Sequence, residues 1–358
     1  MHRAAPKPRR RDNDRWNMLS RHYHDRGLVL VLGAGISTAS NLPGWEELLR
    51  RVGEACWRTD GRARVEKLIE SGMSLPAIAG VLQSECGKHP SRFRAQLKRA
   101  LYRDFPFREQ AMQPTKRAAH FRQVVQFVHG GTPGAERNST LAAVAGLCVQ
   151  QADGSGAFLP NPRIHAVVTS NVDVLLRTYV RARYGDWLLG TVESARRTRR
   201  RGKVPTYYMH GFLRYYAKAR EAGDESAECV FTEEEYFDFF NRPYSVFNYT
   251  LLYLLREFNC LFVGMSMQDL NIRRLLHYST AERCEVVKER ATRTGLRHYA
   301  ILKRPEDPEI ERLTDISLRR IGTRGLWVED FEEIPARLGA MYGEGWPAVF
   351  GANGRGDS

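Results

Sequence analysis

The stretch Leu28-Val29-Leu30-Val31-Leu32-Gly33-Ala34-Gly35-Ile36-Ser37 decides the fold that we expect for this chain. Its first half is apolar without polar alternation, which is typical of a strand buried on both faces of a parallel sheet. Its second half is a glycine loop, and an amphipathic helix follows, with apolar side chains at helical spacing at Trp45, Leu48, Leu49 and Val52. A buried strand, a glycine turn and a helix open an α/β fold with a Rossmann-like parallel sheet.

Three further apolar runs end in small polar loops in the same way. They are Ala166 to Thr169 before Ser170-Asn171-Val172-Asp173, Thr206 to Met209 before His210-Gly211, and Leu261 to Val263 before Gly264-Met265-Ser266. Ligands of open α/β sheets bind beyond the carboxyl ends of the strands, so we expect these loops to converge on one nucleotide-sized site. Apolar runs at 299–302 and 326–328 supply further strands of a sheet that carries helices on both faces.

The remaining segments suggest how the chain is organised around that sheet. Residues 1–26 are polar and basic without sustained periodicity, and we expect a basic N-terminal arm. Residues 27–350 form the expected main domain, and residues 351–358 a flexible tail. Within the domain, almost only helical periods occur from about 46 to 160, which predicts a large helical insertion. This insertion is the first candidate for contacts with a partner or a second copy.

The cysteines do not form a known metal or redox motif. They stand at positions 56, 86, 148, 229, 260 and 284, without a Cys-x-x-Cys pair. This excludes a zinc ribbon and a thioredoxin-like motif, and we expect the cysteines to be reduced and partly buried. The run Cys229-Val230-Phe231 predicts a short strand, and Thr232 with Glu235 predicts a capping box at the start of the next helix.

The excess of positive charge favours an anionic partner. Fifty-five Lys and Arg residues against 41 Asp and Glu give a net charge of +14, which suits a dinucleotide, nucleic acid or an acidic protein surface. Two clusters, Lys7 to Arg11 and Arg196 to Lys203, hold much of this charge. Because aromatic residues are not interleaved with them, a solvated tail and loop are favoured over a nucleic-acid site. The chain also lacks a membrane-length apolar run and a signal-peptide pattern, which predicts a cytoplasmic protein.

Two glycine loops are candidates for binding phosphate. In Gly33 to Ser37, the missing side chains would let backbone amides approach a pyrophosphate at a helix start. Thr38 stands where the dinucleotide fingerprint has its third glycine, which argues against an ordinary dehydrogenase. Gly264-Met265-Ser266 repeats the pattern of strand, glycine and hydroxyl. The alternatives are a tight turn for the first loop and a helix cap made by Ser266 and Asp269 for the second.

Three polar side chains at strand ends are candidates for chemistry. Asn171 and Asp173 follow one predicted strand, and His210 follows another. Asn and Asp are also common helix caps, and a lone His is usually structural. His210, however, precedes a glycine that leaves room beside it at a strand's carboxyl end.

Together, these segments resemble the sirtuin family, of the silent information regulator type. The match lies in the Gly-Ala-Gly-Ile-Ser loop, in Ser170-Asn171-Val172-Asp173 for the family's Thr-Gln-Asn-Ile-Asp, in His210-Gly211, and in Gly264-Met265-Ser266 for the later Gly-Thr-Ser. Their order and spacing also agree, and the resemblance spans most of residues 28–280.

Two departures indicate the branch of that family. Sirtuin deacylases carry a four-cysteine zinc module between the His and the last glycine loop, whereas residues 211–263 hold only Cys229 and Cys260. The family's Pro-Asp-Phe-Arg is replaced by Leu42-Pro43-Gly44-Trp45. With both changes the chain is similar to the zinc-free sirtuin-like domains of prokaryotic antiphage defence systems. That resemblance implies an NAD+ hydrolase that depletes cellular NAD+ and uses no zinc.

The resemblance and the residue chemistry give a hypothesis for the site. The residues expected to bind NAD+ as substrate are Gly33, Ala34, Gly35, Ile36, Ser37, Ser170, Gly264, Met265 and Ser266. Asn171 would orient a water or the ribose hydroxyls, since an amide both donates and accepts and stays neutral. His210 would be the general base. Asp173, by its matching position in the family, would hold the carboxamide or the ribose.

Other functions and the means of control stay open. The alternatives are a catalytically silent sensor of NAD or ADP-ribose, an NAD-dependent protein deacylase, and a nucleic-acid-associated subunit. An NAD+ hydrolase needs control, and since the sequence shows no obvious switch, we expect a homo-oligomer or a separate partner protein. Proteins that the chain resembles work with a DNA-translocase-type ATPase, an Argonaute or a cyclic-nucleotide signal. Any contact with nucleic acid would be indirect, and no membrane contact is expected.

Overall fold

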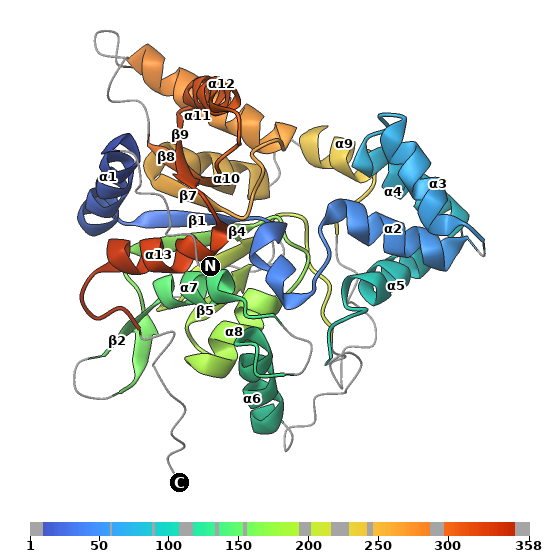
Figure 1. The fold of residues 1–358 in the computed structure, drawn as a ribbon, viewed down its shortest axis with the longest axis horizontal. Coiled ribbons are helices and arrows are strands. Elements are labelled where there is room, and N and C mark those ends of the chain that lie inside the picture. The colour runs from blue at the N-terminus through green and yellow to red at the C-terminus, as the bar shows by residue number, and fades with distance from the viewer. Residues whose placement is uncertain are drawn as a thin grey trace, which may run out of the picture.

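A seven-stranded sheet forms the centre of the chain in this computed structural model (Figure 1). The structure describes residues 10–57, 59–87, 90–106, 117–132, 136–152, 156–192, 202–215, 229–241, 246–286 and 297–347. The strands follow the order β5-β6-β4-β1-β7-β8-β9, and all neighbouring pairs are parallel. They are β1 (Leu28–Leu32), β4 (Ile164–Thr169), β5 (Leu189–Val192), β6 (Val204–Tyr208), β7 (Asn259–Val263), β8 (His298–Lys303) and β9 (Thr323–Val328). The predicted Rossmann-like parallel sheet is confirmed.

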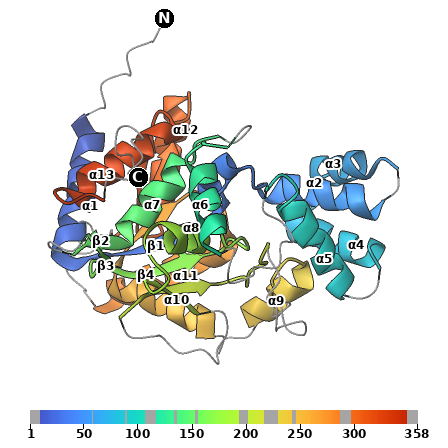
Figure 2. The same ribbon diagram turned by 90° about the horizontal axis from the view of Figure 1, so that it is seen from below.

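Helices cover both faces of this sheet (Figure 2). They include α1 (Arg10–Arg26), α6 (Arg117–Val128), α7 (Ser139–Leu147), α8 (Leu175–Arg183), α10 (Val246–Glu257), α11 (Leu270–Val286), α12 (Pro308–Arg319) and α13 (Ile334–Tyr342). Leu28, Leu30 and Leu32 lie in one core with buried residues of α1, α7, α8 and α13. Val29 and Val31 lie in a second core with α10 and α11. Burial on both faces explains why β1 shows no polar alternation.

The four strands that carry the candidate loops are neighbours in the sheet. β6, β4, β1 and β7 lie side by side, and because they are parallel their carboxyl ends share one edge. From β1 the chain passes to β4, then to the edge strand β5 and back to β6 between β4 and β5, and it then crosses to β7 on the other side of β1. The loops after β1 and β7 therefore meet at the topological switch point, where open α/β sheets bind ligands.

The helices predicted between 46 and 160 fall into two groups. α2 (Trp45–Cys56), α3 (Gly61–Glu70), α4 (Leu75–Glu85) and α5 (Pro90–Leu101) gather beside the sheet, and we call them the helical lobe (Figure 2). α6 and α7 return to the sheet, and α7 is buried from Leu141 to Leu147. Two short antiparallel strands that the sequence did not suggest follow, β2 (Val149–Gln151) and β3 (Phe158–Pro160).

The prediction of an arm before β1 is wrong for residues 10–26, which form helix α1. Trp16, Leu19 and Tyr23 are buried against the sheet. The apolar face was hard to see in the sequence because a charged residue is buried with it. Arg15 is 8% exposed and pairs with the equally buried Asp315 of α12. Residues 1–9, the basic segment 193–201 and the predicted tail 351–358 lie outside the described residues.

The run 229–231 is not a strand, contrary to prediction. The Val230 amide donates to the His210 carbonyl at 3.1 Å, but no ladder with the sheet is formed. The capping box that follows is confirmed at the start of α9 (Glu233–Asn241). The Glu235 carboxylate accepts from the amide of Thr232 at 3.1 Å, and the Glu235 amide donates to the Thr232 hydroxyl at 3.3 Å. Among the described helices, none is both long and apolar enough to cross a bilayer.

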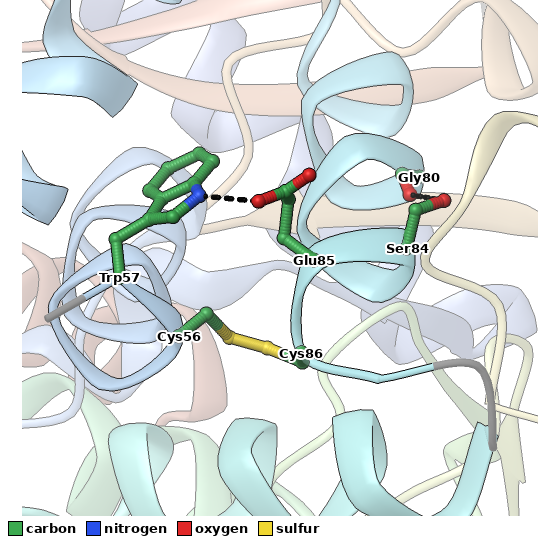
Figure 3. Close-up of a disulfide and its surroundings, with 6 residues drawn as sticks. All are labelled: Cys56, Trp57, Gly80, Ser84, Glu85 and Cys86. Carbon is green, nitrogen blue, oxygen red and sulfur yellow. Dashed lines mark hydrogen bonds between the residues drawn. A yellow bond between two sulfur atoms is a disulfide. The ribbon is translucent and has the colours of Figure 1, made fainter.

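A disulfide joins two helices of the helical lobe (Figure 3). Cys56 is the last residue of α2 and Cys86 caps the end of α4, and their Cα atoms are 4.8 Å apart. The prediction of reduced cysteines is wrong for this pair, because sequence spacing does not reveal that two helix ends meet. Cys148, Cys229 and Cys260 are free and buried, and the Cys284 side chain lies outside the described part of the chain.

Reduction of the Cys56–Cys86 bond is expected to destabilise the helical lobe. The two cysteines are 30 residues apart, and loop-closure entropy for that length gives about 3–4 kcal/mol. Thermal unfolding with and without a reductant measures the loss, and Cys56→Ser in the absence of reductant reproduces it. A Tm that responds to neither change would contradict the prediction.

Candidate active site

A pocket of about 250 Å³ lies at the carboxyl edge of the sheet, where the strand-end loops face the helical lobe. The strand-end residues that line it are Gly33, Ala34, Ser170, Asn171, Val172, Asp173, His210, Gly264, Met265, Ser266, Met267 and Asp269. The other lining residues are Pro43, Trp45, Leu48, Leu101, Val230, Phe231 and Tyr236. All three predicted catalytic residues therefore line one pocket with most of the predicted binding residues. Gly35, Ile36 and Ser37 are not among the lining residues.

The two glycine loops pack directly against each other. The Gly33 amide donates to the Val263 carbonyl, and the Gly35 amide donates to the Gly264 carbonyl, each at 3.0 Å. A Cβ at Gly33 would lie 2.4 Å from the Gly264 carbonyl oxygen. A Cβ at Gly264, where φ is +69°, would lie 2.6 Å from the Ile36 nitrogen. The glycines therefore allow two backbones to cross at the switch point.

This packing commits most of the first loop's amides to backbone partners. Besides Gly33 and Gly35, Ile36 donates to the Gly33 carbonyl at 3.2 Å and Ser37 to the Ala34 carbonyl at 2.9 Å. Close loop packing is thus one reason for glycine here that involves no ligand. A role of the loop in holding a pyrophosphate stays a prediction.

Gly264→Ala is expected to destabilise the protein strongly. The methyl group meets backbone atoms that cannot move aside, at a φ that L residues rarely adopt, which predicts a loss of roughly 3 kcal/mol or more. Gly80→Ala is the matched control, because Gly80 lies inside α4 and a Cβ there would find its nearest contact at 3.6 Å. In that helix alanine is expected to stabilise by about 0.5–1 kcal/mol. Thermal denaturation of both variants tests the contrast, and equal Tm values would contradict it.

Asn171 places an unpaired amide in the pocket. Its backbone N–H donates to the Thr169 hydroxyl at 3.0 Å, which holds the turn directly after β4. The side chain is buried, at 7% exposure for the residue. Neither Nδ2 nor Oδ1 has a hydrogen-bond partner among the described residues. A buried amide without partners costs about 1–3 kcal/mol, so its retention in a pocket points to a ligand that pairs with it.

Asp173 is a buried carboxylate at the start of α8. Its Oδ1 accepts from the Leu175 amide at 2.9 Å. Burial raises the pKa of the Asp173 carboxyl, whereas the Leu175 amide and the nearby Ser37 hydroxyl and Asn171 amide lower that pKa. Neither the Ser37 hydroxyl nor the Asn171 side chain forms a hydrogen bond within the described part of the chain. The helix-cap role of Asp173 is thus present in the structure.

His210 is a buried imidazole beside an aromatic ring and a carboxylate. It is 7% exposed and meets the Tyr236 ring edge to face, with 5.3 Å between centroids. Burial lowers the pKa of His210, and the charge of Asp269 opposes this by raising the pKa. The imidazole is therefore neutral near pH 7, the state in which a histidine accepts a proton.

An aromatic wall completes the pocket, and the sequence analysis missed it as part of the site. Trp45 of α2 packs edge to face on Phe231, with centroids 5.7 Å apart, and Tyr236 of α9 adds a third ring. These residues come from two distant segments of the sequence, around 45 and 231–236, and their spacing there is that of ordinary core residues. Only the approach of the helical lobe to the sheet edge could have revealed them.

Asp269 is a further lining residue that was not predicted as part of the site. Of the helix cap predicted for Ser266 and Asp269, the structure shows the Asp269 part: its Oδ1 accepts from the Ile272 amide at 2.9 Å at the start of α11. Arg273 of the same turn donates to the Met267 carbonyl at 3.2 Å and so holds the loop in place. Asp269 lines the pocket and acts on the charge of His210.

The pocket wall is acidic. Its lining includes the carboxylates of Asp173 and Asp269 and the neutral His210, and within the described part of the chain no Lys or Arg lines it. Such a wall favours a cationic group over an anionic one. Across the described ranges, no three His, Cys, Asp or Glu side chains gather as a metal site would require. The absence of zinc from the functional protein stays a prediction.

Residues 165–321 match the model of the SIR2-like domain family. The matched range includes the loops with Asn171, His210 and Gly264 and ends before β9, while the Gly33 loop lies outside it. No curated protein matches the chain significantly. The SIR2-like domain associates the chain with NAD-related activity and makes it a possible NAD-using enzyme.

Proposed function

We propose that this protein hydrolyses NAD+ at the bond between nicotinamide and ribose and releases nicotinamide and ADP-ribose. The observation that carries the proposal is the unpaired, buried amide of Asn171, which lines one pocket with the buried, neutral His210. The match to the SIR2-like domain supports NAD+ as the substrate. Together they supply a polar group to position a reactant and a base to take its proton.

The size and charge of the pocket support a particular orientation of NAD+. At about 250 Å³ the pocket is smaller than the roughly 300–1,000 Å³ of sites that enclose a whole drug-sized ligand. It suits the nicotinamide ribose half, and the two carboxylates favour the positively charged nicotinamide ring. The adenosine half would lie outside, over the exposed Ala34 and Ser266 of the two glycine loops.

The chemistry requires little acid catalysis. When the C1′–N bond breaks, both electrons stay with the nicotinamide nitrogen, so nicotinamide leaves as a neutral molecule and the ribose passes through an oxocarbenium-like state. A water oxygen then forms the new bond to C1′. In the proposal Asn171 orients that water or the ribose hydroxyls, His210 accepts the proton that the water loses, and Asp173 holds the ribose or the carboxamide.

Asp269→Asn is expected to shift the acid limb of the rate profile to lower pH. The Asp269 charge raises the pKa of His210, so its removal lowers that pKa and keeps the imidazole neutral in more acidic solution. Asparagine still caps α11, which preserves the fold. Measuring kcat/KM from about pH 5 to 8 tests this. A limb that stays in place or moves to higher pH would count against His210 as the base.

One incubation separates the proposal from its alternatives. The purified chain is mixed with NAD+ and an acetyl-lysine peptide, and all products are identified by mass. Nicotinamide and ADP-ribose with an unchanged peptide support hydrolysis. A deacetylated peptide makes the protein a deacylase, and saturable NAD+ binding without products makes it a sensor. An affinity for DNA that falls steeply with salt would support a nucleic-acid-associated subunit.

The biological role that we propose is depletion of cellular NAD+ during antiphage defence, in a cytoplasmic protein that needs no zinc. It rests on the two departures at residues 211–263 and at Leu42-Pro43-Gly44-Trp45, with which the chain is similar to the sirtuin-like domains of such systems. A separate partner protein or self-association would provide control. NAD+ levels in bacteria that express the chain, measured before and after phage infection, test the role.

A further inference from the structure

Helix α12 exposes an apolar face that belongs to neither core. Ile310, Leu313 and Ile316 are 50%, 47% and 43% exposed. Large apolar residues on a protein surface usually occur singly, so three on one short helix mark a contact site. α12 lies at the edge of the molecule that is far from the helical lobe (Figure 1).

The inner side of α12 is firmly held, so this exposed face cannot simply turn inward. Asp315 is buried and accepts from Arg15 of α1. Arg304, at the end of β8, donates to the Glu311 carboxylate at 2.5 Å. Leu318 is buried in the second core. These contacts hold the inner side of α12 against the protein, and they therefore keep Ile310, Leu313 and Ile316 exposed.

The order of charged and apolar residues along the exposed face is self-complementary. Four residues at intervals of four, three and four lie in one line along the helix. They are Glu309, Leu313, Ile316 and Arg320. All four residues are exposed, and Arg320 continues the helical backbone. At 1.5 Å per residue the line is about 16 Å long. A twofold rotation through the point midway between Leu313 and Ile316 reverses the direction of the helix. It exchanges the positions of Leu313 and Ile316, and it also exchanges those of Glu309 and Arg320.

We propose that α12 is a contact between two copies of this chain, paired antiparallel about a twofold axis. In that arrangement Leu313 of one copy faces Ile316 of the other, and Glu309 faces Arg320 at both ends. An interface of this kind is isologous and closes after two copies. Glu309 now pairs with Arg312 at 2.6 Å, but both side chains are more than half exposed, so that pair is weak and can exchange its partner.

The expected association is reversible. One helix pair buries less than the roughly 1,000 Å² that a stable interface needs. The surface does not depend on the proposed chemistry, and it differs from the helical lobe that the sequence suggested for self-association.

Sedimentation velocity of the full chain over a concentration series tests the proposal. The wild-type protein is expected to pass from monomer to dimer in the micromolar range. Leu313→Glu combined with Ile316→Glu should raise the Kd at least about tenfold, because like charges then face each other. Met73→Glu, at a 38% exposed site in the helical lobe, is the matched control and should leave the Kd unchanged.

Exchanging the charges of Glu309 and Arg320 gives a second test. A variant that had lost its fold could not recover the wild-type Kd. Glu309→Arg alone brings two arginines together and should weaken the dimer. Glu309→Arg with Arg320→Glu restores opposite charges at both ends and should recover the wild-type Kd within a factor of a few. A wild-type chain that stays monomeric, apolar-face variants that dimerise normally, a dimer lost in Met73→Glu, or a double exchange that fails to recover would each overturn the proposal.

Discussion

Replacing Asn171 by alanine is expected to lower the rate of NAD+ cleavage by roughly 100-fold or more, the usual scale for a positioned polar group. The Asn171 side chain has no hydrogen-bond partner in the described part of the chain and lies buried in the pocket. Its amide is therefore available to a substrate in the pocket. Nicotinamide release under saturating NAD+ measures the effect, and a variant with the wild-type rate would remove Asn171 from the mechanism.

The stability of the same variant provides an independent readout. Because the Asn171 amide is unpaired, its removal should leave the Tm unchanged or raise it. Asn138 is the matched control, since it is also buried but fully engaged. Its Nδ2 donates to the Ile36 carbonyl at 2.8 Å and to the Ser40 hydroxyl at 2.9 Å, and its Oδ1 accepts from the Leu141 amide at 2.9 Å. Asn138→Ala should cost about 1–3 kcal/mol of stability, opposite to Asn171→Ala.

His210→Ala is the second change with a large expected effect, a loss of roughly 100-fold or more in kcat. Burial keeps the imidazole neutral near pH 7, and no other histidine of the described residues lines the pocket. With the ring removed, the attacking water loses its base. The acid limb of the pH profile should disappear together with the rate, which a purely structural role of the ring would not cause.

His120→Ala is the matched control for this experiment. His120 is also buried, and burial lowers its pKa as well, but it pairs with the Tyr215 hydroxyl at 2.8 Å and does not line the pocket. We expect its removal to cost stability and to leave kcat within a factor of a few. Equal losses of kcat in both variants would mean that His210 acts through the fold alone.

The sheet was predictable because its strands are uniformly buried. Leu28–Leu32 and Asn259–Val263 are buried at every position, and apolar runs of this kind have few other interpretations. Polar loops at their carboxyl ends then had to share one edge. Helix α1 was missed for the opposite reason, since its inward side includes Arg15, whose charge is neutralised by a residue 300 positions away. Nothing local in the sequence signals such a pair.

The site was predictable where single residues follow strands and unpredictable where segments meet. Asn171, Asp173 and His210 were found because each directly follows a buried strand. The aromatic wall depends on the approach of Trp45 and Tyr236 from helices outside the sheet. The glycine loops fitted two interpretations. The absence of side chains suits phosphate binding, and it also lets two backbones cross. Only the contact of Gly33 with Gly264 shows that the loops serve the crossing.

A crystal structure of His210→Ala soaked with NAD+ tests the central claim most directly, because the slow variant should retain its substrate. We expect the nicotinamide ribose inside the pocket, with a ribose hydroxyl or an ordered water bonded to the Asn171 amide and C1′ facing the space vacated by the imidazole. A pocket that contains the adenine instead, or that stays empty at saturating NAD+, would contradict the account.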